Sequence, residues 1–188
     1  MVNDSRFYYG VGLLIILISF VVFALGFEKR KPRAREIVML VCMISFAVIG
    51  RVIFYMTPQV KPCAAIIIIT GIALGKKAGF LTGAMTAFVS NFFMGQGPWT
   101  PWQMVAFGLL GYIFGTAYSK RSVGSYIPNK QKGFICFMGM LATIVVYGVI
   151  MDTATVLMST DSPSVKAFIT AYTAGFIMNV IHGISTFI

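Results

Sequence analysis

Several polar side chains that could bind a small molecule lie inside strongly apolar stretches of this sequence. Arg51, Asn91, Tyr147, Asp152 and Tyr172 each fall within such a stretch. Ionisable groups are costly inside a membrane span, and they usually face the interior of a helix bundle or a water-filled cavity. Two interpretations of Arg51 and Asp152 stay open: a structural ion pair, or direct contact with a ligand.

A second group of candidates follows Asn91 in the stretch NFFMGQGPWTPWQM, residues 91–104. Two glycines and two prolines indicate a defined turn. Tryptophans are also ordinary residues at a membrane interface. Aromatic faces beside neutral amides suit a flat, hydrogen-bonding organic molecule, whereas an inorganic ion would favour carboxylates or carbonyl rings. The candidates here are Gln96, Trp99, Thr100 and Gln103.

The elements that must position these residues are membrane-spanning helices. Hydrophobic residues make up 58% of the chain and charged residues only 11%, against about 25% in soluble domains. The apolar runs are too long and too uniform for alternating barrel strands. We therefore expect an all-α membrane protein. The predicted spans cover residues 8–27, 36–56, 63–74, 77–94, 102–118, 133–156 and 165–187.

The basic residues predict the orientation of these spans. The net charge is +10, and most lysines and arginines lie in short clusters at residues 29–35, 76–77 and 120–132. If all seven segments cross the membrane, the three clusters fall on the same side of it. The positive-inside rule then predicts a multi-pass protein of the cell membrane, with its N-terminus outside and its C-terminus in the cytoplasm. Clusters between apolar runs do not form the basic face of a nucleic-acid-binding protein.

Counting along each predicted helix places the buried polar residues at similar depths. At about 1.5 Å per residue, Arg51, Asn91 and Tyr147 lie roughly 21–22 Å from the inner ends of their helices, and Asp152 lies about 28 Å from its own. Tyr172 lies about 10 Å below the outer end of the last helix. We expect these groups to meet near the outer side.

Small residues recur at every fourth position, at Gly71, Gly75, Gly79 and Gly83. Such a stripe lets helix backbones approach closely. Two interpretations stay open: packing within the bundle, or a docking face for a partner membrane protein. His182, near the inner end of the last helix, is interpreted as a structural residue.

The chain lacks the motifs of the catalytic alternatives. It has no GxxxxGK[ST] motif and therefore cannot hydrolyse ATP itself, and it has neither HExxH nor GxSxG. Its three cysteines are far apart, so no metal site is indicated. An intramembrane enzyme using Asp152, His182 or Cys63 is one alternative to a binding protein. A structural or assembly subunit without a ligand is the other.

The sequence resembles the substrate-specific S components of energy-coupling factor (ECF) vitamin transporters. The resemblance rests on Arg35-Glu36, on Arg51, on the connection at residues 58–62, and above all on GQGPWTPWQM. It implies a six-helix substrate-binding domain at residues 36–188, with residues 1–35 adding one N-terminal transmembrane helix and a basic cytoplasmic loop. It also implies a vitamin-capturing subunit of an ABC-type importer that is not itself an enzyme.

The resemblance further implies partners, a site and a substrate. The partners are a transmembrane coupling subunit and two ATPase subunits, which use the ATP; the chain itself holds no permanent cofactor. Ligand contact is carried over to Asn91, Gln96, Trp99, Thr100 and Gln103. Four further candidate ligand contacts rest only on their estimated depth in the membrane: Arg51, Tyr147, Asp152 and Tyr172. The tryptophan-containing loop looks most like that of members assigned to cobalamin, so a corrinoid is the expected vitamin.

Overall fold

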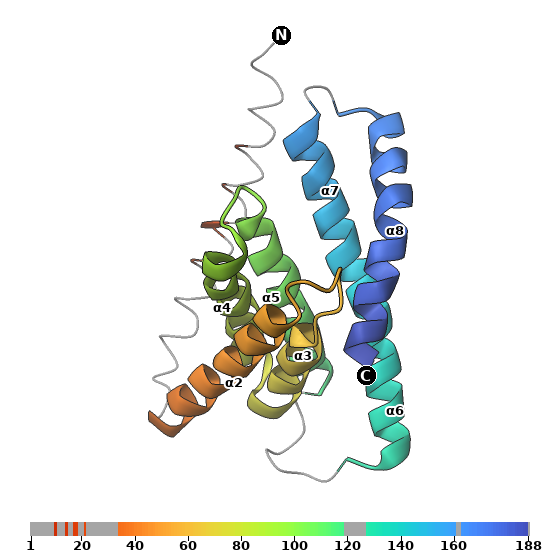
Figure 1. Cartoon of the computed structure of the whole chain (residues 1–188). Coiled ribbons are helices and arrows are strands. Elements are labelled where there is room, and N and C mark those ends of the chain that lie inside the picture. The colour runs from red at the N-terminus through yellow and green to blue at the C-terminus, as the bar shows by residue number, and fades with distance from the viewer. Residues whose placement is uncertain are drawn as a thin grey trace.

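The computed structural model describes residues 10, 14, 17, 18, 21, 34–118, 127–160 and 163–187. All regular structure in these ranges is helical (Figure 1). The elements, in chain order, are α2 (Ala34–Ile53), α3 (Cys63–Leu74), α4 (Lys76–Met94), α5 (Thr100–Ala117), α6 (Asn129–Ala142), the π-helix η1 (Thr143–Tyr147), α7 (Gly148–Ser159) and α8 (Val165–Phe187).

The all-α membrane architecture predicted from the sequence is confirmed. In the described residues, α2, the continuous α6–η1–α7 rod and α8 are long and apolar enough to cross a membrane. α3 has only 12 residues, about 18 Å of helix, which is shorter than a bilayer core. The predicted first span, residues 8–27, lies mostly outside the described residues. Seven crossing segments therefore remain a prediction.

Close packing of α3, α4 and α5 forms the centre of the bundle. A Cβ atom built on Gly71 would lie 2.2 Å from the carbonyl oxygen of Gly111, and one on Gly79 would lie 2.5 Å from the same oxygen. A Cβ on Gly83 would lie 2.3 Å from the carbonyl oxygen of Phe107. Only glycine allows backbones to approach this closely.

These contacts favour the packing interpretation of the glycine stripe over the docking one. α5 covers the faces of Gly71, Gly79 and Gly83, so a partner cannot reach them in this structure. Gly75 has a different role: it joins α3 to α4 with φ +91°, a conformation that glycine adopts without strain.

The predicted helix at residues 133–156 is a longer rod that runs from Asn129 to Ser159. Its hydrogen bonding changes at η1, a π-helical segment that ends at Tyr147. Such segments are frequent at functional sites because they rotate the following residues relative to an uninterrupted α-helix. The side chain of Tyr147 is buried, with 7% of its surface exposed.

The α7–α8 pair is displaced along the bundle relative to α3, α4 and α5. The backbone N–H of Lys61, just before α3, donates to Ser185 Oγ at 2.7 Å. Ser185 is 20 residues into α8, about 30 Å from its start. Lys61, in the connection between α2 and α3, thus lies beside the C-terminal end of α8. In Figure 1 the upper ends of α7 and α8 extend past the α4–α5 loop.

Candidate functional site

Arg51 joins three helices through two hydrogen bonds. Its Nη1 donates to Ser90 Oγ on α4, and its Nη2 donates to Gln103 Oε1 on α5 at 3.0 Å. The arginine is only 2% exposed. A guanidinium that is this buried needs hydrogen-bond acceptors to offset the loss of its hydration. The site is thus built around a fixed positive charge.

The same network continues into the α4–α5 loop. Asn91 Nδ2 donates to Gln103 Oε1 at 2.9 Å and to Thr100 Oγ1 at 2.8 Å. Thr100 Oγ1 in turn donates to Gln96 Oε1 at 2.9 Å. Gln96 Nε2 donates to the carbonyl oxygen of Phe88 at 2.9 Å. The structure therefore brings five predicted site residues into one connected set: Arg51, Asn91, Gln96, Thr100 and Gln103.

The two tryptophans of the loop have different surroundings. The indole ring of Trp99 lies against Gly97, where an added Cβ would come within 2.4 Å of the ring. Trp99 is 39% exposed, so a face or edge of its ring remains accessible. Trp102 points inward, and its indole N–H is buried without a hydrogen-bond partner. Of the two tryptophans, Trp99 is the more exposed.

An aromatic cluster lies directly against the polar network. The guanidinium of Arg51 lies over the ring of Phe107, 5.4 Å from its centroid. Phe107 packs against Tyr147 at a centroid distance of 4.7 Å, and His182 meets Tyr147 edge-on at 4.6 Å. Tyr147 is therefore connected to the network through Phe107. Both ring nitrogens of His182 are buried without a partner, and so is Nε of Arg51.

Asp152 and Tyr172 lie apart from this network and connect α7 to α8. Asp152 Oδ2 accepts a hydrogen bond from Asn179 Nδ2 at 2.9 Å. The hydroxyl of Tyr172 lies 2.9 Å from Thr153 Oγ1. Arg51 and Asp152 have different partners in the described residues, so the structure does not form the ion pair considered from the sequence. Counting residues along each helix placed Asp152 and Tyr172 at a depth similar to that of Arg51. The displacement of α7–α8 explains why these two residues nevertheless lie apart from the network.

Sequence reasoning missed Ser90 and Phe107. A signal for Ser90 was present, because Thr82, Thr86 and Ser90 recur at every fourth position on one face of α4, and all three are buried. Phe107 had no comparable signal, since aromatic residues are common throughout this chain. Its position next to Arg51 depends on how α2 packs against α3 and α4, which brings the Arg51 side chain to α5.

A second positive charge lies near Arg51. Burial lowers the pKa of the Lys61 side chain below its usual 10.5, and the charge of Arg51 lowers that pKa further. Burial and the charge of Arg51 therefore both disfavour the charged form of Lys61.

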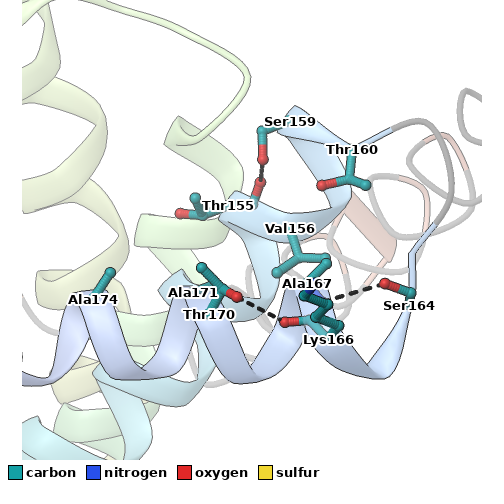
Figure 2. A pocket seen from close by; sticks show the side chains of 10 residues that line it. All are labelled: Thr155, Val156, Ser159, Thr160, Ser164, Lys166, Ala167, Thr170, Ala171 and Ala174. Carbon is teal, nitrogen blue, oxygen red and sulfur yellow. Dashed lines mark hydrogen bonds between the residues drawn. The ribbon is translucent and has the colours of Figure 1, made fainter.

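A hollow of about 480 Å³ lies between the C-terminal end of α7 and the N-terminal part of α8 (Figure 2). Its hydroxyls serve their own helices: Ser159 donates to the Thr155 carbonyl, Thr170 donates to the Lys166 carbonyl, and Ser164 accepts from the N–H of Ala167. No predicted site residue lines this hollow. It is therefore not our candidate site.

Comparison with known proteins gives one match. The family model for the ECF-type riboflavin transporter S component matches residues 33–188. No curated protein and no solved structure matches the chain. The matched range covers α2 to α8 and every residue of the hydrogen-bonded network. The resemblance noted from the sequence is thereby confirmed, and the chain belongs to the family of ECF-type riboflavin transporter S components, which are transporter subunits and not enzymes.

Proposed function

We propose that this chain captures riboflavin from outside the cell and passes it inward together with an ECF coupling subunit and two ATPase subunits. The family description supports a flavin, because it names riboflavin. We therefore propose riboflavin in place of the corrinoid expected from the tryptophan-containing loop.

The observation that carries this proposal is the amide network held by Arg51. Asn91 uses its two amide hydrogens for Thr100 and Gln103, which leaves its carbonyl oxygen as an acceptor. Gln103 Oε1 already accepts two hydrogen bonds, so only its amide nitrogen can serve a ligand. The edge of a flavin ring alternates C=O, N–H and C=O groups. Amides that offer one acceptor and one donor match such an edge.

The aromatic residues suit the faces of the same ring. Trp99 is partly exposed beside the network. Offset stacking on an indole stabilises a flat heteroaromatic ring beyond the effect of its buried area. The described network supplies polar partners from α2, α4, α5 and the loop between α4 and α5.

The test is a binding measurement on the full-length purified protein without ATP. Riboflavin, flavin mononucleotide, cobalamin and biotin are compared by isothermal titration calorimetry, and quenching of flavin fluorescence gives a second readout. We expect riboflavin to bind most tightly. Preferential binding of cobalamin would instead support the original corrinoid expectation. Failure of all four to bind would favour a subunit without a vitamin ligand.

Replacing Asn91 tests the site itself. The variant Asn91→Ala removes one acceptor and leaves Thr100 and Gln103 without their shared donor. We expect riboflavin affinity to fall by about 1–3 kcal/mol, the usual cost of losing a buried hydrogen-bond partner. Gln131→Ala is the matched control, because it removes an exposed amide at the start of α6. Equal affinity in the two variants would place the vitamin elsewhere.

A further inference from the structure

Two side chains beside the hydrogen-bonded network have buried polar atoms without a hydrogen-bond partner in the part of the chain that the structure describes. These atoms are Nε of Arg51 and both ring nitrogens of His182. Arg51 is 2% exposed and His182 is 1% exposed, so bulk water does not reach them. Nearly all buried polar atoms in proteins are hydrogen-bonded, and each exception calls for an explanation.

Arg51 and His182 come from different helices but contact the same aromatic ring. The guanidinium carbon of Arg51, on α2, lies 5.4 Å from the centroid of the Phe107 ring. The ring of His182, on α8, meets Phe107 edge-on with 5.8 Å between the two centroids. The unpartnered groups of α2 and α8 therefore lie around one side chain of α5.

The contact between α8 and the group formed by α2, α3, α4 and α5 is slight. α8 packs mainly against α6, η1 and α7. Toward the α2–α5 group, Ser185 accepts the hydrogen bond from the backbone of Lys61, and His182 meets Phe107. His182 and Ser185 are three residues apart and so face the same side of α8. A ligand bonded to both Arg51 and His182 would strengthen this sparse contact.

Hydrogen-bond chemistry limits which ligand group could do this. Nε of an arginine is only a donor, whereas a neutral imidazole offers one donor and one acceptor. A hydroxyl group both donates and accepts, so neighbouring hydroxyls could satisfy Arg51 and both nitrogens of His182. Riboflavin carries a row of hydroxyls on its ribityl chain. The ring edge that we match to Asn91 and Gln103 leaves this chain free to reach another part of the site.

We propose that the ribityl chain of riboflavin bridges Arg51 and His182, so that vitamin binding ties α8 to the α2–α5 group. This inference rests on the proposed function and deepens it, because it assigns a second part of the vitamin to named residues. It gives His182, interpreted from the sequence as structural, a role in binding. It also explains why a buried imidazole is kept at a cost in stability: its nitrogens serve the vitamin.

The experiment compares riboflavin with lumiflavin, which has the same ring but a methyl group in place of the ribityl chain. Both are titrated into the full-length protein and into His182→Phe by isothermal titration calorimetry. We expect His182→Phe to weaken riboflavin binding roughly tenfold, the effect of losing one or two buried hydrogen bonds, and to leave lumiflavin binding unchanged. Equal losses for the two flavins, or no loss for either, would overturn the proposal.

Two further variants separate binding from folding. His182→Gln keeps a donor and an acceptor at this position and should retain most of the riboflavin affinity. It also keeps the test open if His182→Phe does not fold. Thr173→Val is the matched control, because Thr173 is exposed on α8 and its hydroxyl donates to carbonyls of its own helix. This control should bind both flavins like the unmodified protein.

Hydrogen exchange at the amides of residues 176–187 tests the connection to α8. We expect riboflavin to slow this exchange several-fold in the unmodified protein, and lumiflavin to leave it unchanged. If riboflavin binds and Asn91→Ala weakens it, but His182→Phe alters neither affinity nor exchange, the bridge fails and the proposed function stands. If the unmodified protein binds neither flavin, the proposed function itself fails.

Discussion

Gln103 is the residue at which the polar contacts of the site converge. Its Oε1 accepts from Arg51 on α2 and from Asn91 on α4, so one amide ties three helices together. The sequence identified Arg51 and Asn91 as candidates because polar groups in apolar segments are expensive and rarely face lipid. It identified Gln103 because that residue lies in the stretch that follows Asn91 and carries the two tryptophans. It could not show that Arg51 pairs with Gln103 and not with Asp152, since that choice depends on the relative heights of the helices.

The unpartnered ring nitrogens of His182 lead to a prediction about stability. His182 is 1% exposed, and both nitrogens lack a partner. A buried polar group without a hydrogen bond costs about 1–3 kcal/mol. Phenylalanine keeps the ring and its edge contact with Tyr147 but carries no polar atom. We expect His182→Phe to raise the free energy of unfolding by about 1 kcal/mol, as measured by thermal unfolding in detergent.

The contrasting variant is His182→Ala, which removes the ring and leaves a cavity. Such truncations usually cost about 2–5 kcal/mol. If His182→Phe destabilises the protein as much as His182→Ala does, the imidazole nitrogens must have partners that this arrangement does not include.

At the scale of helices, the contact between α4 and α5 determines the geometry of the site, because Asn91 and Gln103 come from these two helices. A Cβ on Gly111 would lie 2.3 Å from the carbonyl oxygen of Gly79, a backbone atom that cannot move aside alone. We expect Gly111→Ala to lower the free energy of unfolding by about 1–3 kcal/mol or more, the usual cost of overpacking. Thermal unfolding and the yield of folded protein measure this effect.

Gly133 provides the control for this prediction. It lies in α6, and an added Cβ there would meet nothing within 4 Å. Gly133→Ala should leave stability unchanged or raise it slightly, because alanine favours the helix. Similar losses in both variants would mean that the close approach of α4 and α5 does not limit stability.

At the scale of the whole molecule, the orientation in the membrane remains a prediction from the basic clusters. Ser164, between α7 and α8, and Lys130, at the start of α6, are both exposed. With Cys42, Cys63 and Cys136 replaced by alanine, Ser164→Cys should react with a membrane-impermeant maleimide in intact cells. Lys130→Cys should react only after permeabilisation. The reverse pattern would invert the predicted topology and place the α4–α5 loop inside.

The sequence alone determined the helical membrane class, the family and most residue types of the candidate site. These follow from local properties: the length of apolar runs, the loop motif and the cost of polar groups in lipid. Only the tertiary structure decided which candidates meet. The displacement of α7–α8, fixed by contacts such as Lys61 with Ser185, separates Asp152 and Tyr172 from Arg51 and Asn91. Counting residues measures position along one helix, whereas the height of one helix against another is set by side-chain packing between distant segments.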